Sequence, residues 1–118
     1  MESESFKLTK TFIGKQVEVI IDRPIGSKHP KHSFLYEVNY GYIKDVIAPD
    51  GEDLDAYFLG VDKPLEKAEG RVIAIIHRAD NDDDKLVVVP YGVSMSDKEI
   101  FKQVSFQEQW FQSSVVRK

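Results

Sequence analysis

Residues 50–55 gather four carboxylates within six positions, in the order Asp-Gly-Glu-Asp-Leu-Asp. Such a cluster repels itself, and holding it together costs free energy unless a cation compensates. Mg²⁺ is a hard cation that takes oxygen ligands, commonly a few carboxylates together with waters and substrate phosphates. On a strand, Asp53 and Asp55 would point to the same side, roughly 6–7 Å apart. The segment is a candidate metal site, and a solvated acidic turn is the plain alternative.

A second acidic run, residues 80–84, stands directly before Lys85. Its spacing does not fit an EF-hand, because Lys85 occupies the place of the turn glycine and Tyr91 the place of the bidentate glutamate. A charged hairpin tip is the simpler interpretation of the run taken alone. A lysine at the start of an apolar strand, however, presents a fixed positive charge that suits a phosphate oxygen.

Basic side chains gather in one stretch, where Arg23, Lys28 and Lys31 accompany His29 and His32. The chain as a whole carries a net charge of −4. Proteins that bind nucleic acid by neutralising phosphates usually have an overall basic excess, so nucleic acid is not an expected partner. A zinc site is also disfavoured, because the chain has no cysteine and the two histidines flank a proline. A solvated basic loop is the favoured interpretation.

The chain of 118 residues has room for one core, and we expect a single domain over residues 1–118. Its hydrophobic fraction of 42% is ordinary for a globular protein. No apolar run reaches the roughly 18 residues that span a bilayer, so a membrane is not an expected partner. The acidic N-terminus lacks the features of a signal peptide. A cytoplasmic location is therefore the expectation.

Several segments must position these side chains. β-Branched and apolar runs predict strands at residues 17–22, 54–59, 71–77 and 85–90. Residues 34–43 are rich in aromatic side chains and predict extended pieces around a turn or bulge at residues 39–41. Ser96 and Glu99 have the spacing of a helix capping box. A helical stripe of apolar side chains then follows it, at Ile100, Val104, Phe111 and Val115.

Five or so short strands and one late helix predict a mainly β fold. The specific expectation is a small, OB-like, five-stranded closed barrel with a C-terminal helix.

Three of these segments together resemble the soluble, family I inorganic pyrophosphatases, which are magnesium-dependent enzymes built on a five-stranded barrel. Residues 36–43 are similar to that family's Tyr-Pro-x-Asn-Tyr-Gly-Tyr-Ile segment, and residues 50–55 to its Asp-Gly-Asp-Pro-x-Asp signature. Residues 83–90 are similar to its Asp-x-Lys-Leu-Val-x-Val-Pro strand. The three occur in the family's order at compatible separations, and such an ordered set is specific.

The resemblance implies a role for each matching residue. It implies metal ligation by four aspartates: Asp50, Asp55, Asp80 and Asp83. It implies phosphate contacts from three further side chains: Lys28, Tyr40 and Lys85. The proton acceptor for the attacking water would be Glu52, or Asp53 beside it. The implied cofactor is Mg²⁺ and the implied substrate is inorganic pyrophosphate.

The chain departs from the family pattern at several of the family's site positions. Glu52 stands where the signature has its middle aspartate; glutamate keeps the carboxylate but adds one methylene, and a displacement of about 1 Å can be costly in catalysis. Asp53 replaces the usual proline. Glu18 and Ile20 stand where the family carries a lysine and a glutamate on its first strand. Residues 110–111, Trp-Phe, stand near the family's late Tyr-Lys pair.

The expected function is therefore Mg²⁺-dependent hydrolysis of inorganic pyrophosphate to two phosphates by a metal-activated water. Three alternatives stay open at this point. The chain could bind metal and phosphate without turnover, it could act on a nucleotide or another phosphoanhydride, or it could be a barrel module for oligonucleotides, which its acidic pI disfavours. Because family members often form rings, a homo-oligomer is possible.

Overall fold

The computed structural model describes residues 3–49, 51–79 and 83–117 of the chain. Two helices and six strands follow one another along it, and the complete set with its bounds is α1 (Glu4–Lys10), β1 (Gln16–Arg23), β2 (Asn39–Ile47), β3 (Asp53–Phe58), β4 (Lys67–Arg78), β5 (Lys85–Val89), α2 (Asp97–Glu108) and β6 (Ser113–Val116). No helix within these ranges is long and apolar enough to cross a membrane.

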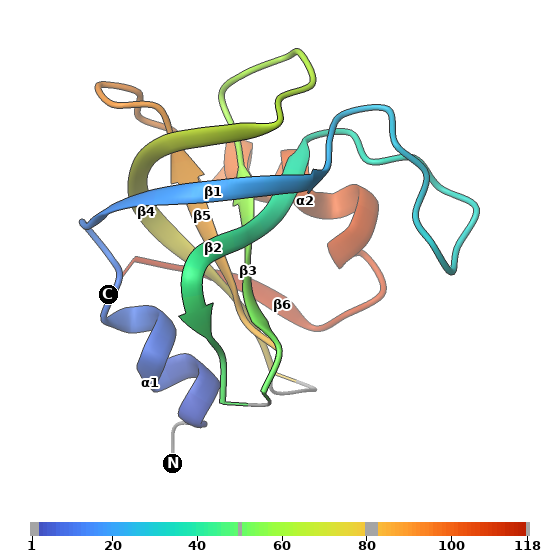
Figure 1. The fold of residues 1–118 in the computed structure, drawn as a ribbon. Helices are drawn as coiled ribbons and strands as arrows, with labels where there is room; N and C mark the ends of the chain where they lie inside the picture. Colours follow the sequence, from blue (N-terminus) through green and yellow to red (C-terminus); the bar gives the residue numbers. More distant parts are fainter. Residues whose placement is uncertain (1–2, 50, 80–82, 118) are drawn as a thin grey trace.

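Five of the strands close into a barrel (Figure 1). Their order is β1-β2-β3-β5-β4, and β1 pairs with β4 to complete the ring. Within the described residues β3 and β5 run parallel, and the other pairings are antiparallel. The long strand β4 pairs with β1 through its first half and with β6 through its last residues. The predicted closed five-stranded barrel with a C-terminal helix is confirmed.

Alternation along the strands divides the side chains between the barrel interior and its outer face. On β3, Leu54 and Ala56 point into one buried cluster inside the barrel, whereas Tyr57 belongs to a second cluster. This second cluster also contains Ile100 and Val104 of α2, so α2 covers part of the outer face. Asp55 is two residues from Tyr57 on the same strand, so its side chain points to the same outer face, where α2 is packed.

Residues 39–41 form the start of β2, so of the predicted turn or bulge there is no turn. The strand pairing is irregular at this place, because the register opposite Gly41 and Tyr40 shifts between Ile21 and Arg23 of β1. A Cβ added at Gly41 would sit 1.8 Å from the backbone oxygen of Ile20. Only glycine permits this close approach of the two strands, and this explains its place in the motif.

Asn39 holds two loops at one end of the barrel. Its Oδ1 accepts from the backbone N–H groups of Ile25 and Leu65, each over 3.2 Å. Its Nδ2 donates to the backbone oxygen of Lys63 over 2.9 Å. A fully buried amide with these partners is stabilising, whereas an unpaired one would be costly. The long loop after β1, which extends away from the barrel in Figure 1, is thus anchored next to β2.

The predicted strands and helix start are confirmed, with two differences. The Ser96 hydroxyl accepts from the Glu99 N–H over 3.1 Å, as the capping box predicted. The helix ends at Glu108, however, so the predicted stripe extends too far. Phe111 lies beyond the helix and Val115 belongs to β6, where it packs against the α2-facing cluster from a strand. Neither β6 nor α1 was predicted from the sequence.

Candidate active site

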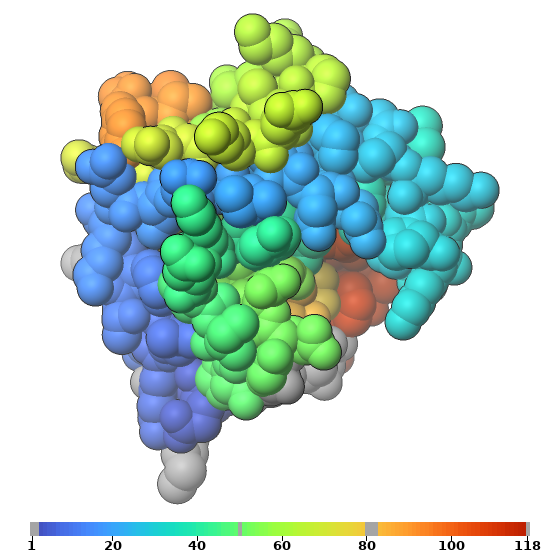
Figure 2. Space-filling model, in the orientation of Figure 1, coloured from blue at the N-terminus to red at the C-terminus, as the bar shows by residue number. Residues whose placement is uncertain are grey.

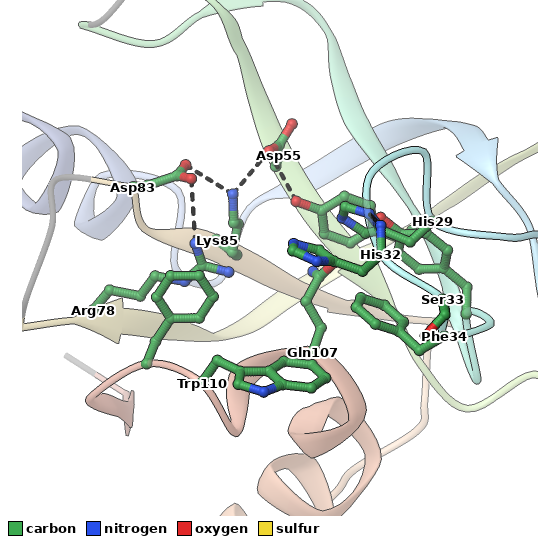
Figure 3. Close-up of a pocket in the computed structure, with 13 residues that line it drawn as sticks. His29, His32, Ser33, Phe34, Asp55, Arg78, Asp83, Lys85, Gln107 and Trp110 are labelled. Carbon is green, nitrogen blue, oxygen red and sulfur yellow. Dashed lines mark hydrogen bonds and ion pairs between the residues drawn. The ribbon is translucent and has the colours of Figure 1, made fainter.

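Lys85 joins two carboxylates on the outer face of the barrel. Its Nζ lies 2.8 Å from Asp55 Oδ2 and 2.7 Å from Asp83 Oδ1 (Figure 3). The parallel register of β3 and β5, which sets Ala56 opposite Leu86, brings Asp55 and Lys85 side by side. The lysine side chain is only 3% exposed, whereas the two carboxylates are 33% and 46% exposed. A buried ammonium therefore holds two accessible carboxylates in fixed positions.

Tyr40 of β2 fixes the same aspartate from the other side. Its hydroxyl donates to Asp55 Oδ2 over 2.8 Å. Burial raises the pKa of the Tyr40 phenol well above 10, and the negative charge of Asp55 raises it further. The phenol therefore stays protonated at neutral pH and remains a hydrogen-bond donor.

Arg78, the last residue of β4, forms a buried ion pair with Glu108 at the end of α2. Its Nη2 lies 2.7 Å from Glu108 Oε2, and its Nε donates to Oε1 over 3.0 Å. The arginine is 5% exposed and the glutamate is fully buried. The third nitrogen, Nη1, donates to Asp83 Oδ2 over 3.3 Å. The guanidinium thus connects the helix to the aspartate that Lys85 also holds.

The hydrogen bonds around Glu108 keep this pair ionised. The carboxylate also accepts from the hydroxyls of Tyr57 and Ser113, each over 2.6 Å. Burial by itself would raise the pKa of Glu108, but the hydrogen bonds and charge of Arg78 outweigh it and the pKa is lowered. Burial alone would lower the pKa of Arg78, and Glu108 in turn raises it. Both groups are therefore charged across the physiological range.

These side chains border a pocket of about 700 Å³. Figure 2 shows the surface hollowed between the cyan loop that follows β1 and the red C-terminal part of the chain. Charged and aromatic side chains line the pocket together: His29, His32, Ser33, Phe34, Tyr36, Tyr40, Asp55, Arg78, Asp83, Lys85, Gln107, Trp110 and Phe111. Four of the residues expected to bind metal or phosphate therefore meet here: Tyr40, Asp55, Asp83 and Lys85.

Three further candidate site residues that the structure describes do not line the pocket. Lys28 is exposed on the loop after β1, where it forms an isolated bridge with Leu35, and it does not line the pocket. Glu52 and Asp53 are exposed at the start of β3 and are also absent from the described lining. Asp50 and Asp80 lie outside the described residues.

Sequence reasoning missed two charged residues of the site, Arg78 and its buried partner Glu108. Arg78 and Glu108 carry no motif, because their pairing depends on how α2 packs against β4. Residue spacing alone could not reveal this pairing.

The described donors suit a hard divalent cation. Asp55 and Asp83 supply carboxylate oxygens, are partly open to solvent, and already attract one buried cation between them. No group of three or more histidine, aspartate or glutamate side chains that could hold a metal forms within residues 3–49, 51–79 and 83–117. A complete ligand set would thus need waters, substrate oxygens or the aspartates outside those ranges. The chemistry of the two donors fits Mg²⁺.

Comparisons with known proteins converge on one family. A sequence model of the family described as inorganic pyrophosphatase matches residues 10–114. The structure is similar to the inorganic pyrophosphatase of Ehrlichia chaffeensis, with a TM-score of 0.64 and 20% identity, over 87% of this chain and 84% of that one. No curated protein sequence matches the chain.

Two further solved structures support the same fold. The inorganic pyrophosphatase of Neisseria gonorrhoeae is 26% identical, with a TM-score of 0.61, over 79% of this chain and 71% of that one. That of Helicobacter pylori is 16% identical, with a TM-score of 0.61, over 87% of this chain and 82% of that one. The closed barrel with its outer strand and two helices thus matches the fold of these enzymes.

Proposed function

The chain belongs to the inorganic pyrophosphatase family, and from that premise we propose that it hydrolyses inorganic pyrophosphate to two phosphates with Mg²⁺ as its cofactor. Enzymes of this family are hydrolases that act on pyrophosphate. One observation carries the proposal for this chain. Asp55, Asp83 and Lys85 meet in a single pocket that is open to solvent and large enough for the substrate.

The metal would be held by carboxylates on two hairpins. Asp55 and Asp83 are the described ligands, and Asp50 and Asp80 are the proposed ligands outside the described residues. When bound, Mg²⁺ supplies a coordinated water of lowered pKa and so a nucleophile at neutral pH.

The substrate is an anion, and the pocket offers donors for it. Lys85 presents an ammonium whose position is fixed by its two carboxylate partners. Tyr40 presents a protonated phenol beside it. Fixed donors of this kind stabilise negative charge that develops on a leaving phosphate. Lys28, on the exposed loop, is a further proposed phosphate contact.

The proton of the attacking water needs an acceptor near the ligands. Strand alternation puts Asp53 on the same side of β3 as Asp55, two residues away. Glu52 precedes it in the turn that leads into β3. We assign the acceptor role to one of these two carboxylates.

The test is phosphate release from pyrophosphate by the purified chain, with Mg²⁺ and with excess chelator. We expect turnover that requires Mg²⁺ and returns when the metal is restored. A chain that shows Mg²⁺-dependent phosphate binding by calorimetry, but no turnover at any Mg²⁺ concentration, would instead be a binding protein with this fold. The variant Lys44→Met, which removes an exposed ammonium from β2 outside the pocket, should turn over pyrophosphate like the parent.

A further inference from the structure

Three aromatic rings form one wall of the pocket, and we name them the aromatic shelf: His32, Phe34 and Trp110. They are nearly parallel to one another. The interplanar angle is 12° between His32 and Phe34, 18° between His32 and Trp110, and 22° between Phe34 and Trp110. Figure 3 shows His32 and Phe34 across the pocket from Asp83 and Arg78, with Trp110 along the bottom of the view. Because the three rings are stacked on one another, the ring surface left for a flat ligand is the part that Trp110 leaves exposed.

The shelf is open to solvent at its edge. Trp110 is 60% exposed although it is the largest apolar side chain of the pocket, and His32 is exposed as well. An indole placed in this way contributes little burial to folding, and large aromatic side chains beside a pocket commonly serve a ligand. The shelf therefore has ring surface available for a partner.

Ring contacts connect the shelf to the charged end of the pocket. Phe34 lies 6.0 Å from Tyr36 between ring centroids, and Tyr36 is stacked on Tyr40 at 5.4 Å. The hydroxyl of Tyr40 then reaches Asp55. Two ring-to-ring steps thus separate the shelf from the residues proposed to handle the phosphoanhydride.

The pocket is larger than inorganic pyrophosphate requires. A volume of about 700 Å³ lies within the range of roughly 300–1,000 Å³ typical of sites for drug-sized ligands. Pyrophosphate would fill only the charged end. A ligand that fills the whole pocket needs a phosphoanhydride at one end and a flat ring at the other.

We propose that this pocket also accepts a nucleoside diphosphate, with its diphosphate at Lys85, Asp55 and Asp83 and its base stacked on the aromatic shelf. The inference rests on the proposed pyrophosphatase function, because it uses the same charged end. An isoprenoid diphosphate fits less well, because its chain would favour an enclosed apolar tunnel, whereas the shelf is open. Stacking of a base on an aromatic side chain contributes about 1–3 kcal/mol.

The reaction is the hydrolysis of the same bond. The water oxygen forms a bond to the terminal phosphorus, and the bridging bond between that phosphorus and the anhydride oxygen breaks. Inorganic phosphate and the nucleoside monophosphate leave. One proton of the water passes to the carboxylate of Asp53 or Glu52 and then to solvent, and the other stays on the released phosphate. No oxidant or reductant takes part.

Binding can be measured directly, because Trp110 is the only tryptophan of the chain. Its fluorescence is followed during titration with the α,β-methylene analogue of adenosine diphosphate, which is not hydrolysed, in the presence of Mg²⁺. The base-free methylenediphosphonate is the matched ligand. We expect saturable quenching by the nucleotide analogue that the diphosphonate does not reproduce. Equal quenching by both ligands, or none by either, would overturn the proposal.

Turnover supplies the second readout, namely the ratio of kcat/KM for adenosine diphosphate to kcat/KM for pyrophosphate. We expect Trp110→Ala to lower this ratio by about tenfold and Trp110→Phe to restore most of it, since a ring surface is kept. The control is Tyr91→Ala, because Tyr91 is also an exposed aromatic residue but lies outside the pocket lining. A ratio that Trp110→Ala leaves unchanged would contradict the stacking.

The two proposals fail separately. Absence of pyrophosphate turnover would contradict the proposed hydrolase function, whatever the Trp110 fluorescence shows. Turnover of pyrophosphate without base-dependent quenching of Trp110 would contradict only the nucleotide proposal. Quenching by geranyl diphosphate but not by the nucleotide analogue would also overturn it, because the occupant would then be an apolar chain.

Discussion

The ammonium of Lys85 lies 2.8 Å from the Asp55 carboxylate, although the two residues are 30 positions apart in the chain. The contact exists because β5 pairs in parallel with β3, so that the first residue of one strand stands beside the polar face of the other. Burial of the lysine leaves its charge little freedom to move. The carboxylates and the cation are therefore organised before any ligand arrives.

Replacing Lys85 by methionine keeps an unbranched chain of similar length but removes the charge. We expect kcat/KM for pyrophosphate to fall by about 100-fold, since fixed donors that stabilise developing charge have effects of this size. Steady-state phosphate release measures it. The same change at the exposed Lys44 is the control, and equal activity of Lys85→Met and the parent would remove Lys85 from the site.

Replacing Tyr40 by phenylalanine keeps the ring stacked on Tyr36 and removes the hydroxyl that donates to Asp55. A hydrogen bond to a charged group contributes about 1.5–3 kcal/mol, so we expect kcat/KM to fall by at least roughly tenfold. Tyr91→Phe, outside the pocket, should have no such effect.

The same variant tests the protonation state of the phenol. Because burial raises the pKa of Tyr40 above 10, the hydroxyl should remain a donor throughout the neutral and mildly alkaline range. The activity ratio of parent to Tyr40→Phe should then stay constant from pH 7 to about pH 9.5. A ratio that falls towards one within this range would show that the phenol ionises there. Burial would then not raise the pKa of Tyr40 as described.

The Arg78–Glu108 pair should dominate the stability of the contact between α2 and β4. Glu108→Gln removes the buried counter-charge of Arg78 and leaves only the half-exposed Asp83 beside the guanidinium, so we expect the free energy of unfolding to drop by about 3 kcal/mol. Urea denaturation at pH 7 measures the loss. The exposed pair Arg117–Asp97 is the comparison, and Asp97→Asn should cost at most about 1 kcal/mol. Similar losses in the two variants would contradict the account.

The Arg78–Glu108 pair also predicts how the free energy of unfolding changes with pH. The pKa of Glu108 is lowered in the folded state from its ordinary value of 4.5. Its contribution to stability is thus fully present above the unfolded value and is lost as the pH falls through the folded value. On acidification below about pH 4.5 the parent should lose stability more steeply than Glu108→Gln. If the free energy of unfolding of the two proteins fell equally steeply with acidification, Glu108 would have the same pKa in the folded and unfolded states.

Local patterns along the chain were enough to predict most of the barrel. The apolar runs became β1, β3, β4 and β5 because buried strands need such runs, and the Ser96 hydroxyl capped α2 as its spacing predicted. The sequence predicted no strand at residues 113–116, because this segment is short and two of its residues are serines. That strand, β6, forms because β4 extends far enough to offer a pairing edge at residues 75–78.

The candidate site was predicted only in part, for a physical reason. Asp55 and Lys85 lie within recognisable motifs, and the two acidic segments carry a pattern that their chemistry explains. Arg78 and Glu108 do not, because a buried ion pair between a strand and a helix is decided by tertiary packing. The aromatic shelf depends in the same way on the fold of the loop after β1, which brings Phe34 against Trp110.

Gly41→Ala tests whether close approach of β1 and β2 sets the barrel geometry. The new methyl group would meet the Ile20 backbone oxygen at 1.8 Å, so the strands must separate. We expect the free energy of unfolding to drop by more than about 3 kcal/mol, as strained substitutions with backbone displacement do. At Gly14, where an added Cβ meets nothing within 4 Å but φ is +86°, alanine should cost only about 1–2 kcal/mol. Thermal unfolding of both variants decides the point.

The role of Asp55 as a metal-holding carboxylate in a hydrolytic site is the centre of the account. Asp55→Asn keeps the shape of the side chain and removes its charge, and Asp62→Asn, outside this pocket, is its matched control. Phosphate release from pyrophosphate at saturating Mg²⁺ measures both variants beside the parent. We predict that Asp55→Asn loses at least about 100-fold in kcat/KM, while Asp62→Asn stays within twofold of the parent. An Asp55→Asn variant as active as the parent would contradict the account.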